Sequence, residues 1–229
     1  MTIDEFSDGF DVLLNSYNSK TPFGDSPSVG IVLDEYEKSV LLTEAQDQIV
    51  IELYTGRNER RASFEKTEEL RTYLRPLIRT HICEEVNVSS AKLCEESKLF
   101  KLPPDNLFIT YESATLDDSK AGCMNNRIIS VIPSTQDDFH HISKNPFRGP
   151  NERRAIRLDY STDTVEIVSK YNIKDYTIRY LSRPSPIYLI DLDEEHLKSG
   201  CLLDPSIHKY ILERAVQLAI STRAASNKN

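Results

Sequence analysis

The chain has 229 residues and a net charge of −8 at pH 7, because 36 Asp and Glu residues outnumber 28 Lys and Arg residues. This length suffices for one large domain or two small ones, and the presence of only 7 glycines excludes a collagen-like or low-complexity chain. The acidic balance argues against a general nucleic-acid coat, which needs a basic surface to bind phosphates.

The first part of the chain has a helical pattern. A first helix is predicted from Thr2, which has capping-box spacing to Glu5. The apolar residues that follow share one helical face and are Phe6, Phe10, Leu13, Leu14 and Tyr17. We therefore expect an amphipathic helix at the amino terminus.

Two more helices are predicted before residue 82. The second begins near Asp34, with Glu37 as its capping partner, and ends at Gly56. Its expected buried stripe consists of Leu41, Leu42, Ala45, Ile49 and Leu53. The third covers residues 67–75, where Pro76 should kink or stop it.

After about residue 82, apolar and polar residues alternate, which is typical of β-strands. A turn at 161–163 predicts a hairpin between two of the expected strands. The expected strands lie at 107–111, 127–132, 156–160, 165–167 and 176–181. A closing helix is predicted from Asp204 and Pro205, because Pro is favoured at the first helical position.

Helices and strands are segregated along the chain, so the predicted fold class is α+β. We expect a helical body, made of the N-terminal helices plus the C-terminal helix, with an inserted antiparallel β region. The predicted bounds are 1–81 and 203–222 for the helical body, 82–202 for the β-rich insertion and 223–229 for a flexible tail.

The sequence predicts neither membrane insertion nor a disulfide framework. Residues 1–6 are acidic and lack the order of a signal peptide, and no stretch approaches the roughly 18 apolar residues of a membrane span. The four cysteines have no paired spacing, so we expect reduced thiols, as in a cytosol. They are Cys83, Cys94, Cys123 and Cys201.

No motif in the chain predicts catalysis, a cofactor or a metal. A phosphate loop, a dinucleotide fingerprint, a serine-hydrolase elbow and zinc-finger spacing are all missing from the sequence. Three groups of residues are candidate metal sites by residue type: Asp137, Asp138, His140 and His141; Asp191, Asp193, Glu194 and Glu195; and Asp159, Glu166 and Lys170. The favoured interpretation of the first two is a polar helix start or loop and a solvated acidic turn. The third resembles a metal nuclease weakly, because its last pair is spaced Glu-x-x-x-Lys rather than Glu-x-Lys.

Two basic clusters are candidates for an interface with phosphates or with acidic residues of a neighbouring subunit. Arg71, Arg75 and Arg79 are four residues apart and would form a stripe on one helix. The segment 145–154 is rich in turn residues, carries three arginines and offers Phe147 as an anchor. The expected interface residues are Asn145, Pro146, Phe147, Arg148, Gly149, Pro150, Arg153, Arg154, Arg71 and Arg75.

Several segments, in order along the chain, resemble ring proteins of crAss-like, short-tailed bacteriophages that infect Bacteroides. The most specific one runs from Lys144 to Asn151 and continues at Arg153 and Arg154. The others are 33–40, 42–46, 179–184, 186–187 and 211–219. Residues 84–98 carry no resemblance.

This resemblance implies a virion structural protein and no enzyme. It implies a ring in the head-to-tail connector, which joins the capsid portal to the tail. The implied copy number is twelve, to match the portal. The implied partners are the chain itself, the portal protein and neighbouring tail ring proteins, while genomic DNA passes through a channel during packaging, retention and ejection without sequence-specific binding. Such a protein would be found at the portal vertex of the virion after assembly in the host cytoplasm.

Two alternatives stay open at this point. One is a phage metal-dependent nuclease, or another packaging enzyme, that uses the acidic groups near Asp159 and Glu166. The other is a monomeric or dimeric regulatory binding module.

Overall fold

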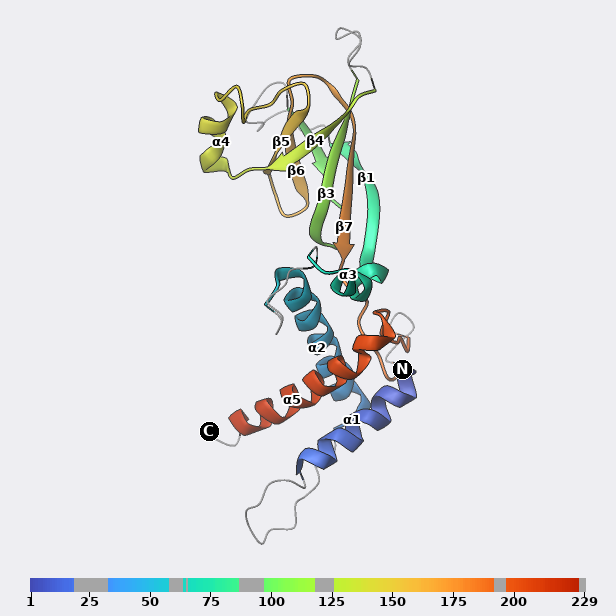
Figure 1. Cartoon of the computed structure of the whole chain (residues 1–229). Helices are drawn as coiled ribbons and strands as arrows, with labels where there is room; N and C mark the ends of the chain where they lie inside the picture. Colours follow the sequence, from blue (N-terminus) through green and yellow to red (C-terminus); the bar gives the residue numbers. More distant parts are fainter. Residues whose placement is uncertain are drawn as a thin grey trace. The chain divides into compact units, whose positions relative to one another are not determined.

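The computed structural model describes residues 1–18, 33–57, 64, 66–86, 97–117, 126–191 and 197–226, with side chains as far as Thr222. The chain divides into two compact units (Figure 1). Met1–Leu77 and Arg183–Asn229 form the helical unit, and Ile78–Ser182 form the barrel unit. Each unit is described by itself below.

The helical unit is built from α1 (Ile3–Asn18), α2 (Glu35–Thr55), α3 (Glu68–Leu74) and α5 (His208–Ser226). Short 3-10 helices at Arg75–Leu77 and Pro205–Ile207 follow α3 and precede α5. Helix α5 reaches Ser226, inside the predicted tail, and residues 227–229 lie outside the described part. No helix among the described residues is long and apolar enough to cross a bilayer.

Both predicted capping boxes are present. The Glu5 amide donates to Thr2 Oγ1 (3.2 Å), and the Thr2 amide donates to Glu5 Oε2 (2.8 Å). The same exchange joins Asp34 and Glu37 at the start of α2. Gly56 ends α2 with a φ of 78°, a conformation that favours glycine.

The core of the helical unit lies between α1, α2 and α5. Its fully buried side chains include Phe6, Phe10, Leu14, Leu42, Ile49, Ile211 and Val216. Leu41, predicted to be buried, is half-exposed, and Gln46 is buried instead. The Gln46 amide is satisfied there because Nε2 donates to the Ser185 carbonyl (2.9 Å).

Lys38 is a buried cation of the helical unit, with 3 % of its surface exposed. Its Nζ donates to Asp11 Oδ2 (2.8 Å), Glu35 Oε1 (3.0 Å) and Ser7 Oγ (3.2 Å). Burial alone would lower the pKa of Lys38, but the two carboxylates outweigh it and raise that pKa above its ordinary value. Lys38 therefore stays charged and joins α1 to α2.

The barrel unit contains seven strands that close in the order β1-β2-β6-β5-β4-β3-β7. Their bounds are β1 Ile78–Val86, β2 Lys98–Lys101, β3 Asn106–Leu116, β4 Ile128–Pro133, β5 Arg154–Asp159, β6 Thr164–Val168 and β7 Ile173–Ser182. All neighbouring pairs are antiparallel except β4 and β5, which run parallel. Helix α4 (Gln136–Ser143) lies in the crossover between them, as a parallel pair requires.

The predicted fold class, a helical body with an inserted antiparallel β region, is wrong. The strands close on themselves into a barrel, and one pair is parallel. Two barrel strands were not predicted, because β1 buries only Cys83 fully and β2 has only four residues. Alternation within one strand identifies that strand, but it does not show which strands pair or whether a sheet closes.

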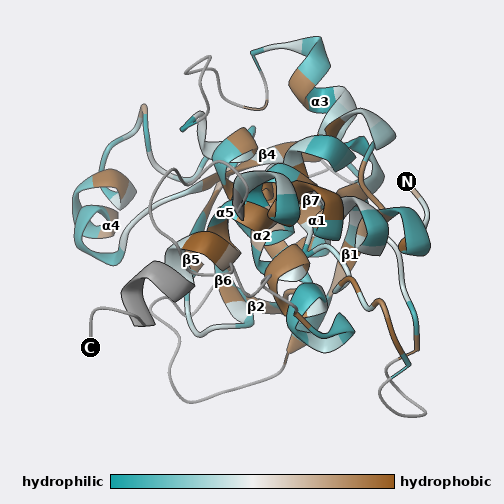
Figure 2. Cartoon of the chain, turned by 90° about the horizontal axis from the view of Figure 1, so that it is seen from below, coloured by the Kyte–Doolittle hydropathy of each residue, from teal (hydrophilic) through white to brown (hydrophobic). Residues whose placement is uncertain are grey.

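The barrel interior is filled by side chains from all seven strands. They include Cys83, Phe100, Leu116, Val131, Ala155, Ile167 and Tyr176. Helix α4 covers part of the outer surface, where Phe139 and Ile142 pack against Ile156, Leu158 and Val168. Figure 2 accordingly shows both hydrophobic and hydrophilic colouring on α4. Strand β5 is therefore buried on both of its faces.

One ionic pair is buried in the barrel. Glu112 Oε1 accepts from Arg157 Nη1 (2.5 Å), and Glu112 Oε2 accepts from the Tyr176 hydroxyl (2.7 Å). Burial raises the pKa of Glu112 above its ordinary value and outweighs the opposing effects of Arg157 and Tyr176. Burial also raises the pKa of Cys83, to about 12. An unreactive thiol results at Cys83.

Candidate functional site

The segment between α4 and β5, residues 145–153, forms an exposed loop that we call the Phe147 loop. Asn145 organises its first half. The Asn145 side-chain oxygen accepts from the amides of Phe147 (2.9 Å) and Arg148 (3.3 Å), and its carbonyl accepts from the Gly149 amide (2.7 Å). Asn145 thus accepts hydrogen bonds from three successive backbone amides of this turn.

Arg154 and Asn151 hold the second half of the Phe147 loop. Arg154 Nη1 donates to the Phe147 carbonyl (3.0 Å). The Asn151 side chain accepts from the Arg153 amide (2.9 Å), and the Asn151 amide donates to the Arg154 carbonyl (2.9 Å). Arg154, one of the predicted interface residues, therefore stabilises the loop from the first position of β5.

Gly149 is the tightest point of the Phe147 loop. A Cβ atom there would lie 2.8 Å from the Asn145 carbonyl oxygen and 3.0 Å from those of Ile142 and Ser143. Such contacts are too short for any side chain, so the backbone would have to move. Only glycine fits this position without displacement.

Phe147 is the most exposed large apolar side chain of the described residues, with 86 % of its surface accessible. Arg148 and Arg153 of the same loop are also exposed, while Glu152 accepts a hydrogen bond from the Tyr171 hydroxyl (3.4 Å). An exposed aromatic side chain on a loop with cations and a fixed backbone is suited to anchoring on another surface. Seven of the ten predicted interface residues lie in this loop, and an eighth, Arg154, is the first residue of β5.

The other two predicted interface residues lie in the helical unit. Arg71 is in α3, and Arg75 is at its C-cap; both are exposed. The third arginine of the predicted stripe, Arg79, lies in β1. The three arginines therefore do not share one helix.

The acidic groups weighed as metal sites do not gather ligands. Among the described residues, no three His, Cys, Asp or Glu side chains are placed to hold an ion. Asp137 and Asp138 lie in the first turn of α4, and His140 and His141 lie in its last turn. Asp191 accepts from the Lys198 amide (2.7 Å), whereas Asp193, Glu194 and Glu195 lie outside the described residues.

The two carboxylates of the nuclease hypothesis, Asp159 and Glu166, point away from each other. Asp159 is opposite Val165 in the β5–β6 pair, and Glu166 is opposite Leu158. Directly opposed residues share a face, and neighbours in a strand alternate, so the two carboxylates lie on opposite faces of the sheet. Glu166 is also buried and accepts a hydrogen bond from Ser97.

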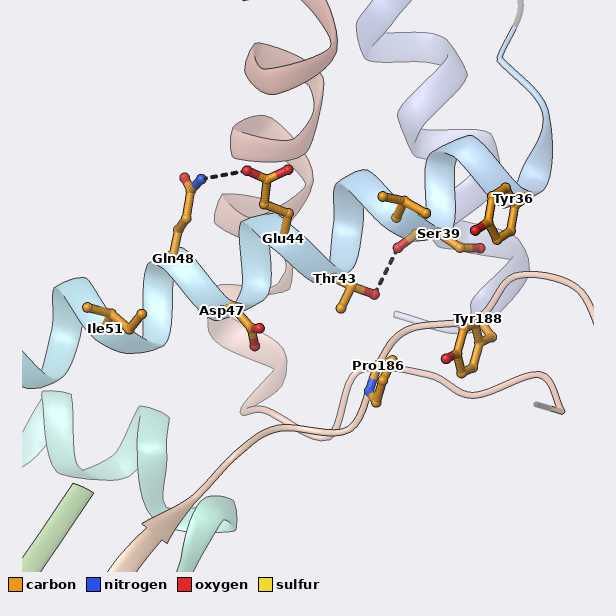
Figure 3. Close-up of a pocket in the computed structure, with 10 residues that line it drawn as sticks. Tyr36, Ser39, Thr43, Glu44, Asp47, Gln48, Ile51, Pro186 and Tyr188 are labelled. Atoms are coloured by element: carbon orange, nitrogen blue, oxygen red, sulfur yellow. Dashed lines mark hydrogen bonds between the residues drawn. The ribbon is translucent and has the colours of Figure 1, made fainter. Parts of the chain in front are cut away.

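Sequence reasoning missed a second surface, a groove along the outer face of α2, which we call the α2 groove. Its volume is about 740 Å³. Its α2 lining residues are Tyr36, Ser39, Val40, Thr43, Glu44, Asp47, Gln48 and Ile51, and Pro186 and Tyr188 complete the lining. Figure 3 shows Thr43 and Asp47 on the side of α2 that faces Pro186 and Tyr188, whereas Glu44 and Gln48 point away from that segment.

The floor of the α2 groove is fixed by hydrogen bonds. Thr43 Oγ1 accepts from the Ile187 amide (3.0 Å), and Ser39 Oγ accepts from the Leu189 amide (2.9 Å). Above the floor, Tyr36, Val40 and Ile51 are 50 %, 48 % and 39 % exposed. The groove is thus preformed and carries apolar side chains that this unit leaves open.

The α2 groove also carries negative charge. Glu44 is exposed and accepts from Gln48 Nε2 (3.2 Å). Burial raises the pKa of Asp47, and the charge of Arg183 partly opposes that rise. The spacing 36, 40, 43, 47 and 51 was the available signal, because it defines a second helical face beside the buried one.

Comparison with known proteins gives consistent matches over the whole chain. A family model described as phage tail ring protein 3/4 matches residues 1–229. "Ring protein 3" of Bacteroides phage crAss001 is 46% identical over 237 residues, covering 100% of both chains. "Ring protein 4/5" of the same phage is 32% identical over 237 residues, covering 96% of this chain and 92% of the relative.

Proposed function

The chain belongs to the phage tail ring protein 3/4 family, and we propose that it works without catalysis, as one subunit of a homo-oligomeric ring in the connector between portal and tail. The coarser part of this statement, a structural ring protein of a crAss-like phage tail, follows from family membership. The location of the ring in the connector and the passage of DNA through it are what we propose in addition.

The observation that carries the proposal is the exposure of Phe147 at 86 % on a loop with a bonded backbone. A closed ring needs a heterologous contact, in which one patch meets a different patch on the next copy. The Phe147 loop and the α2 groove are two such patches of different shape. Both exist in the single chain, so assembly requires little ordering of either.

In the proposed connector, the ring has twelve copies to match the portal. Its neighbours are the portal protein and other tail ring proteins, and genomic DNA passes through a channel without sequence-specific binding. The net charge of −8 suits this role, because a lumen wall that passes DNA should not bind it. Assembly would take place in the host cytoplasm, before the virion is released.

The test is to make phage particles without this protein and to image their portal vertex. We expect heads that lack a joined tail and do not infect, since the connector would be interrupted. Complete and infectious particles without the protein would overturn the proposal. Incubation of the purified protein with DNA and Mg²⁺ tests the nuclease alternative, and we expect no cleavage.

A further inference from the structure

We propose that the Phe147 loop of one copy docks into the α2 groove of the next copy in the ring. This inference rests on the proposed function and adds to it the two surfaces that meet. It commits to a second copy of this chain as the occupant of the groove.

Shape and polarity favour this pairing. Phe147 is a large apolar side chain with 86 % of its surface exposed, and the α2 groove exposes Tyr36, Val40 and Ile51 around a volume of about 740 Å³. Pockets of this size bury small aromatic groups well. Docking would remove apolar area from water on both sides of the contact.

Charge favours it as well. The Phe147 loop carries Arg148 and Arg153, and both are exposed. The α2 groove places Glu44 and Asp47 on its wall, with Arg183 as the one cation that acts on Asp47 in the described part of the unit. Arg forms paired hydrogen bonds to carboxylates, and complementary charge also fixes the register of two docking surfaces.

Both partners are preorganised. The loop backbone is held by Asn145 and Arg154, and the groove floor by Thr43 and Ser39. Binding therefore costs little conformational entropy. Because the two patches are different, contact of one with the other joins copies head to tail, which is the contact that a closed ring repeats.

The first experiment exchanges charges across the proposed contact. Phage particles are produced with Arg148→Glu, Glu44→Arg or both, and copies of the protein per particle are counted by quantitative mass spectrometry. Each single change should lower incorporation about tenfold, and the double change should restore most of it. Lys174→Glu and Asp8→Lys are matched controls at exposed sites outside both patches, and incorporation should not change.

Single reversals with normal incorporation would overturn the proposed contact. So would a double variant that stays as low as the singles while its thermal melting shows a folded protein. If the unaltered protein is missing from infectious particles, the proposed function fails first. If the unaltered protein forms rings in particles and the charge-reversed variants are incorporated normally, the proposed function stands and the proposed contact is wrong.

A second experiment tests whether the contact joins different copies. One tagged chain carries Phe147→Cys and a differently tagged chain carries Val40→Cys; both are co-assembled and treated with a short bismaleimide. We expect a cross-linked product that carries both tags, above the background set by the unaltered chain with its four cysteines. Assembled rings that give only background would overturn the contact.

Discussion

The two units treat a buried charge differently. In the helical unit, Lys38 is buried, but its partners Asp11 and Glu35 keep 49 % and 38 % of their side chains exposed. In the barrel unit, both Glu112 and Arg157 are enclosed, with side-chain exposures of 7 % and 14 %. An ion pair with one solvated side can be broken at modest cost, whereas a pair enclosed on both sides leaves an uncompensated charge. We therefore expect removal of the buried cation to destabilise the barrel unit more than the helical unit.

The largest effect is expected for Arg157→Met. It leaves the Glu112 carboxylate buried without its cation, which should cost the barrel about 3–5 kcal/mol. Amide hydrogen exchange in β5 and β6 measures this loss in the barrel itself. Arg179→Met, on an exposed side chain of β7, is the control and should change little. A loss below about 1 kcal/mol for Arg157→Met would contradict the comparison, because that is the range of exposed pairs.

A smaller effect is expected for Lys38→Met. The two carboxylates that lose their partner are partly solvated, so water replaces much of the interaction, and we expect a loss of about 1–2 kcal/mol. Exchange of amides in α1 and α2 is the measurement. The matched control is Lys209→Met, whose contact to Glu213 is 3.8 Å long and exposed. A loss of stability as large as that of Arg157→Met would contradict the expected difference between the two units.

Both groups should contribute stability that is lost as the pH rises, but in different pH ranges. The pKa of Glu112 is raised in the folded barrel, so its contribution is fully present below the unfolded pKa and is lost as the pH rises through the folded pKa. Glu112→Gln should flatten that part of the barrel's profile. The pKa of Lys38 is also raised, and its contribution should persist until alkaline pH, near and above 10.5. Denaturation over a pH series, with and without Glu112→Gln, checks both signs.

The smallest effect on stability is expected at the surface. Phe147→Ala with Arg148→Ala removes exposed groups, so the free energy of unfolding should change by no more than about 0.5 kcal/mol. Incorporation into particles should nevertheless fall. Gly149→Ala is the complementary variant, because it keeps both side chains but displaces the loop backbone. Normal incorporation of both variants would show that the loop has no role in assembly.

Local features of the fold were predictable from the sequence. The Asp34–Glu37 capping box and Gly56 placed the ends of α2, because these signals act within a few residues. The β5–β6 hairpin was predicted for the same reason. β1 was missed because its one fully buried side chain, Cys83, leaves no alternation to detect. Barrel closure was missed because it depends on pairing between distant strands.

The two candidate surfaces also differ in how far they could be predicted, because one depends on local residues and the other on distant segments. The Phe147 loop was predicted from the Asn145–Pro146 step and from Pro150, which act on the local backbone. The α2 groove was missed because half of it comes from Pro186 and Tyr188, which lie far from α2 in sequence. The sequence shows Tyr36 and Val40 as apolar residues outside the expected buried stripe. It does not show that the segment with Pro186 and Tyr188 forms the other wall of the groove.

The filled barrel has a consequence for transport. Phe100, Leu116 and Tyr176 occupy its interior, so no conduit follows the barrel axis. In the proposed ring, a channel for DNA would therefore lie around the ring axis, between subunits, and not inside any one barrel. Its diameter would depend on the number of subunits, so a change in that number would alter the passage without refolding any of them.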